Sequence, residues 1–167
     1  MTAHDFYTLL DAARLPPIEG WNPPFCGDSR MRIARDGTWF HEEQRIARPE
    51  LVRLFAGLLR KEGDDYLLVT PAEKLSIAVE DASFMAVAMT QDGTGLTFTT
   101  NVGDGVRLGP GHALRMENGV PYLHVRHGLE AKLARAVWHQ LAALAVPRAG
   151  ELGVWSEGAF FALGPAA

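Results

Sequence analysis

The chain has 167 residues, 47% of them hydrophobic and 22% charged, which is the composition of an ordinary soluble globular protein. Its net charge of −4 argues against a nucleic-acid partner, because nucleic-acid binding usually needs a basic face. A single cysteine, Cys26, excludes an intrachain disulfide, and no apolar stretch approaches the roughly 20 residues of a membrane-spanning helix. We therefore expect a cytoplasmic protein with no membrane partner.

The N-terminal part is predicted to be a short helix followed by a loop. Residues 5–15 carry Phe6 and Leu9 on one apolar stripe, and two prolines follow directly as a stop signal. Residues 21–28, "WNPPFCGD", are predicted to form a loop stiffened by its prolines.

A hairpin, a helix and a second hairpin are predicted next. The first hairpin, "MRIARDGTWFH", turns at Asp36 and Gly37; Phe40 is expected to face the core, with Trp39 and His41 on the other face. Apolar residues then recur with a period of 3.6, which predicts a helix over 49–61 that begins at a proline. Two strands are expected at 66–70 and 75–79.

The second half of the chain repeats this order. After strands at 84–89 and 96–100 and a glycine-rich connection at 101–111, a hairpin is predicted from 113–116 and 121–125. A helix over 129–144 and strands at 151–155 and 159–163 complete the prediction.

Hairpin, helix and hairpin thus occur twice, about 83 residues apart, which indicates an internal duplication. The expected fold class is α+β, with two similar hairpin-helix-hairpin halves whose sheets are antiparallel, preceded by the short N-terminal helix. The predicted parts are an N-terminal helix and Pro-rich loop (1–29), a first repeat (30–82), a connecting hairpin and Gly-rich loop (83–111) and a second repeat (112–167).

Few residues suggest catalysis or metal binding. His124 and His127 have a spacing that supplies two metal ligands, but no third ligand at a suitable spacing accompanies them, so we interpret the histidines as scaffold. The glycine-rich stretch lacks the Lys-Ser/Thr of a phosphate-binding loop. Neither a metal nor a cofactor is expected.

An arginine precedes each predicted helix, and these arginines are the candidate ligand contacts. A helix N-terminus carries a partial positive charge, so Arg48 and Arg126 would each add a guanidinium to an anion-binding position. The loop residue Asn101 is added as a third candidate. The alternative is purely local pairing, of Arg48 with Glu50 and of Arg126 with Glu130.

Four stretches resemble the bacterial domain of unknown function 1285 family: "WNPPFCGD…MRIARDGTWF", "IARPELVRLFAGLLRKEGDDYLLVTPAEK", "FTTNVGD" and "YLHVRHGLEA". The resemblance runs in order from Trp21 to about Phe161. It implies two structurally similar halves, each a curved sheet with a helix, loosely similar to pleckstrin-homology folds, and a ligand-binding or signalling role without established catalytic residues. The chain departs from the family pattern at Arg45, where a proline is usual, and at His127, where an acid is more common.

The leading functional hypothesis is a non-enzymatic module for ligand binding or signalling that holds a small anionic ligand or a protein partner. The alternative is a structural module that acts as a homodimer or larger homo-oligomer, because Trp39, Tyr122 and Trp155 are expected to be exposed and sheet edges to be unpaired. The third hypothesis is an enzyme that uses Cys26 with a distant histidine.

Overall fold

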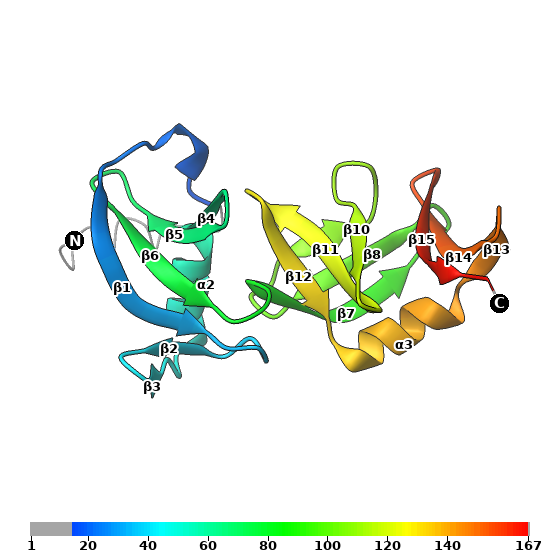
Figure 1. Cartoon of the computed structure of the whole chain (residues 1–167), viewed down its shortest axis with the longest axis horizontal. Helices are drawn as coiled ribbons and strands as arrows, with labels where there is room; N and C mark the ends of the chain where they lie inside the picture. The colour runs from blue at the N-terminus through cyan, green and yellow to red at the C-terminus, as the bar shows by residue number, and fades with distance from the viewer. Residues whose placement is uncertain (1–14, 167) are drawn as a thin grey trace. The chain divides into compact units, whose positions relative to one another are not determined.

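The computed structural model describes residues 15–166 and divides the chain into two compact units, with the boundary between Asp81 and Ala82 (Figure 1). The helix predicted over residues 5–15 lies outside the described residues. Across 15–166, no helix has the length and hydrophobicity needed to cross a membrane.

The first unit contains one sheet and one α-helix. A short 3-10 helix, η1 (Ile18–Gly20), precedes the sheet, and helix α2 (Pro49–Gly57) lies in the middle of the unit's sequence. The strands are β1 (Phe25–Ile33), β2 (Trp39–His41), β3 (Gln44–Arg45), β4 (Leu59–Glu62), β5 (Asp65–Val69) and β6 (Lys74–Val79).

The six strands of the first unit form a mixed sheet in the order β3-β2-β1-β6-β5-β4. Neighbouring strands are antiparallel except β1 and β6, the first and last strands of the unit, which pair in parallel. Two register shifts in β1 accompany a positive φ of 60° at Arg30, as expected of a strand that bends through β-bulges. The curled sheet partly encloses α2 (Figure 1).

Three predictions for the first unit are wrong. The segment 21–28 is not all loop, because β1 begins at Phe25. The helix ends at Gly57 rather than near residue 61, because residues 59–62 pair with β5 in a hairpin. An apolar run such as Leu58 and Leu59 fits either a helix or a strand, and the available pairing partner decides between them.

The orientation of the first hairpin is the third error. Trp39 is only 1% exposed and its ring stacks on Phe55 of α2, with 6.4 Å between centroids. Phe40 faces the other way and is covered by the guanidinium of Arg32, 4.3 Å from its ring centroid. The larger aromatic ring therefore occupies the core, and a cation–π contact covers the smaller ring.

The second unit contains two sheets and one helix, α3 (Arg135–Ala143). The six-stranded sheet has the order β10-β11-β12-β7-β8-β9, and a separate sheet has the order β13-β14-β15. The strands are β7 (Phe84–Gln91), β8 (Leu96–Thr100), β9 (Gly105–Arg107), β10 (Leu114–Glu117), β11 (Val120–Arg126), β12 (Leu129–Leu133), β13 (Val146–Arg148), β14 (Glu151–Ser156) and β15 (Ala159–Pro165).

A buried serine ties the small sheet to the large one within the second unit. The Ser156 hydroxyl accepts a hydrogen bond from the Leu96 backbone N–H (3.0 Å) and donates one to the Leu108 carbonyl oxygen (2.6 Å). Gly95 is needed at this point, because a Cβ there would collide with the Ser156 hydroxyl. Beside it, Arg107 forms ion pairs with Asp92 and Glu157.

Two predictions for the second unit are wrong. The glycine-rich connection 101–111 contains strand β9. The helix predicted over 129–144 starts only at Arg135, because residues 129–133 form β12 between β11 and β7. The alternating burial of "LEAKL" is the period of a strand, and this signal was already present in the sequence.

The six-stranded sheets of the two units share one topology: β1–β3 and β4–β6 in the first, like β7–β9 and β10–β12 in the second, are two three-stranded runs joined by a parallel pair of the first and last strands. Helix α2 lies between the two runs in the first unit, whereas α3 and strands β13–β15 follow both runs in the second. The prediction of two similar halves is confirmed, but the hairpin-helix-hairpin order describes the first unit alone, and the molecule is mostly β rather than α+β. The antiparallel prediction also needs correction, because each six-stranded sheet contains one parallel pair.

Candidate functional site

A pocket of about 420 Å³ opens in the first unit between α2 and the curled sheet. Seven of its eleven lining residues are apolar and four are polar or titratable, and no lysine or arginine is among them. The lining residues are Ser29, Met31, His41, Ile46, Leu51, Phe55, Leu58, Leu68, Thr70, Glu73 and Leu75.

The helical wall of the pocket follows from the spacing of apolar residues. Leu51, Phe55 and Leu58 stand at i, i+4 and i+7, so the first two lie on one face of α2 and Leu58 follows at its C-cap. The Phe55 ring stacks on the ring of Trp39, and this contact restricts the position of Phe55. This wall is therefore preformed rather than assembled by a ligand.

The sheet wall comes from strands β1, β5 and β6. Ser29 and Met31 are two residues apart on β1 and share one face, and Leu68 and Leu75 are paired across β5 and β6. The Asp28 carboxylate accepts the Arg30 backbone N–H at 2.8 Å, which supports the bend of β1 at this point. The bulged strand thus turns its inner face toward α2.

The polar groups of the pocket differ in the hydrogen bonds that they already form with the protein. The buried Thr70 hydroxyl donates to the Glu73 carbonyl oxygen and accepts the backbone N–H groups of Ala72 and Glu73, so it closes a turn. The Ser29 hydroxyl accepts the Met31 N–H at 3.1 Å and still has a proton to donate. His41 is exposed, so its imidazole stands where solvent reaches the pocket.

The predicted ligand contact Arg48 lies in the first unit, at the N-cap of α2, where it is exposed. Its side chain makes no capping hydrogen bond, and none of the ion pairs of residues 15–166 joins it to Glu50. It is not a lining residue of the pocket, although Ile46 and Leu51 on either side of it are.

Arg126 and Asn101 lie in the second unit. Arg126 forms an ion pair with Asp104 (2.6 Å), and its guanidinium lies 4.8 Å from the ring centroid of Phe84. The Asn101 amide oxygen accepts the Met85 backbone N–H at 3.0 Å. The structure therefore brings Arg126 to the loop that begins with Asn101, and both residues have roles in holding that loop.

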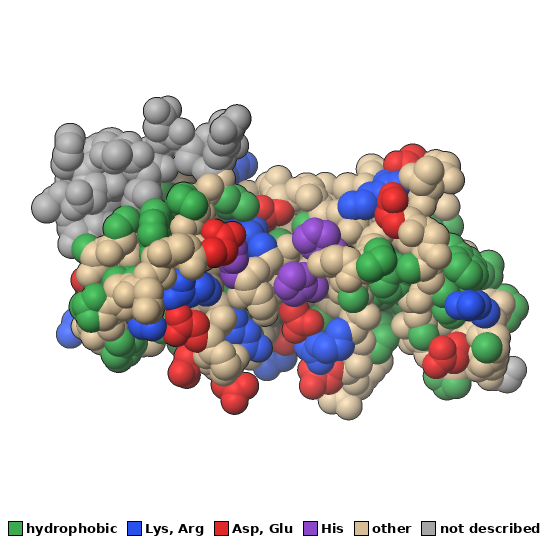
Figure 2. Space-filling view, turned by 90° about the horizontal axis from the view of Figure 1, so that it is seen from above, with side chains coloured by type: hydrophobic (Ala, Val, Ile, Leu, Met, Phe, Trp, Pro, Cys, Tyr) green, Lys and Arg blue, Asp and Glu red, His purple; other side chains and the backbone are tan. Residues whose placement is uncertain are grey.

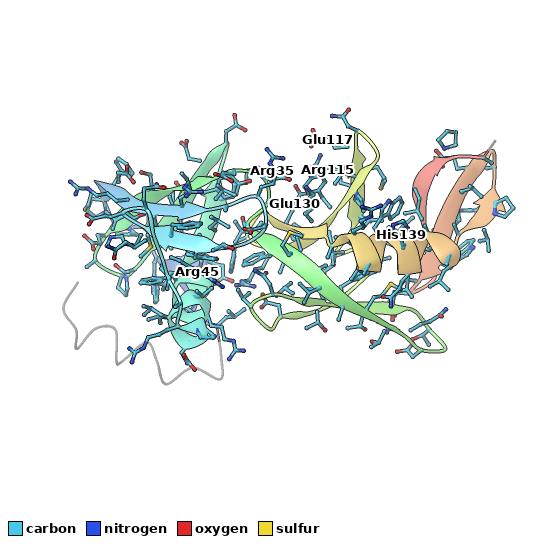
Figure 3. The ribbon with its side chains drawn as sticks, turned by 90° about the horizontal axis from the view of Figure 1, so that it is seen from below. Arg35, Arg45, Arg115, Glu117, Glu130 and His139 are labelled. Atoms are coloured by element: carbon cyan, nitrogen blue, oxygen red, sulfur yellow. The ribbon has the colours of Figure 1, made fainter. Side chains whose placement is uncertain are left out.

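The premise for Arg126 as part of an anion-binding helix N-terminus is wrong. Strand β12 follows it, and the N-cap of α3 is Ala134. The predicted local pair with Glu130 is also wrong, because Glu130 pairs with Arg115. Arg115 of β10 donates two hydrogen bonds of 2.9 Å to Glu130 of β12 and also contacts Glu117 (Figure 3).

Sequence reasoning missed a histidine pair. His112 stacks on His124 with 5.9 Å between ring centroids, and each Nδ1 lies within 3.3 Å of a backbone carbonyl oxygen, to which it donates. The spacing of the two histidines across the β10–β11 hairpin was the available signal. Within 15–166, no group of three or more potential ligands is arranged to hold a metal ion.

Cys26 is exposed at the start of β1, with its sulfur 3.4 Å from the Pro24 carbonyl oxygen. No histidine is among its hydrogen-bond partners in the described part of the chain. Of the aromatic residues expected at the surface, only Trp155 is exposed, at 50%; Trp39 and Tyr122 are buried.

These features define a protein of two similar, mostly β halves with a ligand-sized apolar pocket in the first. The family models assign the same division: residues 16–82 match "Domain of unknown function (DUF1285), N-terminal domain", and residues 83–163 match "Protein of unknown function (DUF1285), C-terminal domain". The chain belongs to the DUF1285 family, as its motifs had suggested.

Two solved structures of the family are similar to this chain. A DUF1285 family protein from Silicibacter pomeroyi DSS-3 is 44% identical, with a TM-score of 0.87 over 92% of this chain and 90% of that one. A DUF1285 family protein from Shewanella baltica OS155 is 26% identical, with a TM-score of 0.58 over 66% of this chain and 87% of that one. No curated protein matches the sequence.

Proposed function

We propose that the protein is a non-enzymatic binding module whose first unit holds a small, largely apolar molecule between α2 and the curled sheet. The observation that carries this proposal is the pocket of about 420 Å³, with seven apolar lining residues. Ligand pockets of this size and composition are typical of small-molecule sites. A signalling role would follow if the bound molecule changes the affinity for a partner.

The composition of the pocket favours a neutral ligand over the anionic ligand predicted from the sequence. Glu73 is a lining residue and no basic side chain is, so a buried anion would lose hydration without gaining a counter-charge. Arg48 lies between the lining residues Ile46 and Leu51 in the sequence, and an anionic ligand would need it at the pocket mouth. The ligand we favour has an apolar body and one polar group that accepts a hydrogen bond from Ser29.

Two fluorescent probes that differ by one sulfonate test the proposal. N-Phenyl-1-naphthylamine is neutral, whereas 1-anilinonaphthalene-8-sulfonate has the same ring system and a negative charge. We expect saturable binding of the neutral probe, with weaker binding of the sulfonate, and quenching of the fluorescence of Trp39, which stacks against the pocket residue Phe55.

A variant that fills the pocket tests whether the neutral probe binds there. Leu75→Trp adds an indole to the pocket wall and should weaken binding of the neutral probe by about tenfold or more, which corresponds to about 1.4 kcal/mol. Leu152→Trp makes the same change on an exposed position of β14 and should leave binding unaltered. Absence of saturable binding, or equal loss in both variants, contradicts the proposal. If the sulfonate binds more tightly and Arg48→Ala removes the difference, the anionic ligand is correct instead.

A further inference from the structure

Two histidines lie side by side at the open end of the β10–β11 hairpin in the second unit. His112 precedes β10 and forms an isolated bridge with Gly109, and His124 belongs to β11. Their imidazole rings stack, with 5.9 Å between the centroids and 27° between the ring planes. Both residues are half-buried, and histidine side chains lie together at the surface in Figure 2.

Backbone carbonyl groups set the tautomer of both rings. The Nδ1 atom of His112 lies 3.1 Å from the His124 carbonyl oxygen, and that of His124 lies 3.3 Å from the Gly111 carbonyl oxygen. A carbonyl oxygen only accepts, so each Nδ1 carries the proton and each neutral ring has its lone pair on Nε2. Neither Nε2 atom forms a hydrogen bond with another group of residues 15–166.

The backbone of the hairpin holds the pair in place. The His124 N–H donates to the Ala113 carbonyl oxygen at 3.0 Å, which continues the pairing of the two strands beyond β10. Leu123 and Val125, on either side of His124, are at most 3% exposed and fix β11 in the core, so the His124 ring faces the other way. The two Nε2 atoms are therefore presented together by a rigid element.

We infer that His112 and His124 form a two-histidine site for a divalent transition metal ion, represented by Zn²⁺, and bind it through both Nε2 atoms. Imidazole suits zinc, copper and nickel. Histidines that bind metals typically donate the other ring N–H to a carbonyl or carboxylate, as both of these do. A zinc ion lies about 2.0–2.1 Å from each nitrogen, so the two Nε2 atoms must come within about 4 Å of each other. The χ2 torsion of histidine has a broad energy minimum, which lets the stacked rings tilt toward a shared ion.

Water completes the coordination of the ion. In the strand register Glu130 of β12 lies opposite His124, but both of its carboxylate oxygens accept hydrogen bonds from Arg115. Glu130 is therefore not counted as a ligand, and it neutralises the charge of Arg115 beside the site. With two protein ligands the site stays open, so binding is reversible and weaker than in a structural zinc site with four.

Isothermal titration of the full chain with Zn²⁺ measures the affinity and the stoichiometry. We expect one ion at this site with a dissociation constant of about 1–200 μM, because two of four ligands supply about half of the binding free energy of a structural zinc site. Nitrogen–proton correlation spectra of the histidine rings in the wild type identify the ligating atoms. Zn²⁺ should shift the Nε2 resonances of His112 and His124, while both Nδ1 atoms keep their protons.

Asparagine variants remove the ligand atom and keep the hydrogen-bond donor. The asparagine amide nitrogen takes the place of Nδ1, so His112→Asn and His124→Asn retain the donor to the carbonyl oxygen but lack Nε2. Each should raise the dissociation constant about tenfold or more. The double variant should bind little more weakly than either single variant, because one ion needs both rings. His139→Asn, on the exposed face of α3, is the matched control and should leave the affinity unchanged.

Three outcomes would overturn the two-histidine site. They are no saturable binding of Zn²⁺ up to about 1 mM, an equal loss of affinity in His139→Asn, and single variants of His112 and His124 that each keep the wild-type affinity. Zinc-induced shifts confined to other histidines would equally overturn it, and that measurement on the wild type does not depend on the folding of any variant. None of these residues lines the pocket of the first unit, so the result is separate from that of the probe experiment.

Discussion

Replacing Ser156 by alanine should destabilise the second unit, because one hydroxyl bridges two backbone groups that are otherwise buried. The hydroxyl accepts from the Leu96 N–H and donates to the Leu108 carbonyl, and all three residues are at most 1% exposed. An unsatisfied buried donor or acceptor costs about 1–3 kcal/mol, so losing both bonds should lower the free energy of unfolding by about 2–4 kcal/mol.

Ser83 provides a matched control in the same unit. It is also 1% exposed, but its hydroxyl has no hydrogen-bond partner among the described residues. Ser83→Ala removes a buried polar group that makes no bond, so its effect on the free energy of unfolding should be close to zero or slightly stabilising. The two substitutions delete the same atom from equally buried serines and should differ by at least about 2 kcal/mol.

Urea unfolding followed by circular dichroism measures this difference, and amide hydrogen exchange at Leu96 locates it. A loss of about 3 kcal/mol should lower the midpoint of thermal unfolding by about 6–12 °C, given about 2–4 °C per kcal/mol for a chain of this size. Equal stability of the two variants, or an unchanged exchange rate at Leu96, would show that the hydroxyl does not complete the backbone pairing at that point.

Two further predictions concern the same unit. Gly153→Ala should lower the free energy of unfolding by about 1–3 kcal/mol in a urea titration, because its Cβ would collide with the Phe161 carbonyl oxygen and the Phe160 ring. Gly164 has open space around it, so Gly164→Ala should leave the free energy of unfolding unchanged. Equal losses in the two variants would contradict the contact. A hydrogen bond from the Arg107 side chain, and a weaker effect of the Thr94 backbone N–H, hold the pKa of Asp92 below its ordinary value. The ionised carboxylate therefore stabilises the folded state above about pH 4, and this stabilisation is lost as the pH falls. Asp92→Asn should flatten that acid-side loss slightly, since the carboxylate is 60% exposed and solvent screens the pair. An acid-side profile that is the same in the wild type and in Asp92→Asn would contradict the contribution of this carboxylate.

Local signals in the sequence predicted the organisation of the fold better than its details. Turn residues and alternating apolar positions located most of the strands, and the repeated order of elements predicted two similar halves, although the second half begins at β7 and not at residue 112. The helix predictions failed at residues 59–62, where the apolar pair Leu58 and Leu59 suits a helix as well as a strand, and at residues 129–133, where the alternating "LEAKL" was assigned to the following helix. In both places a ladder with a neighbouring strand decides the outcome, and that neighbour is not specified by the local pattern.

The candidate site was less predictable, because its parts are distant in sequence. The pocket lining extends from Ser29 to Leu75, and no single segment contains the pattern. Arg126 was predicted beside a helix start, but its partner is Asp104 in an earlier loop. Charge and spacing indicate which residues can interact, whereas strand pairing determines which of them meet.

The positions of the turns and the apolar face of helix α2 follow from local sequence, because they depend on neighbouring residues. The burial of Trp39 in place of Phe40, the parallel closure of β1 on β6 and the position of β15 at the edge of its sheet follow from tertiary packing instead. Such outcomes depend on the competition among distant partners for the same backbone groups and the same core volume. Local sequence constrains that competition but does not settle it.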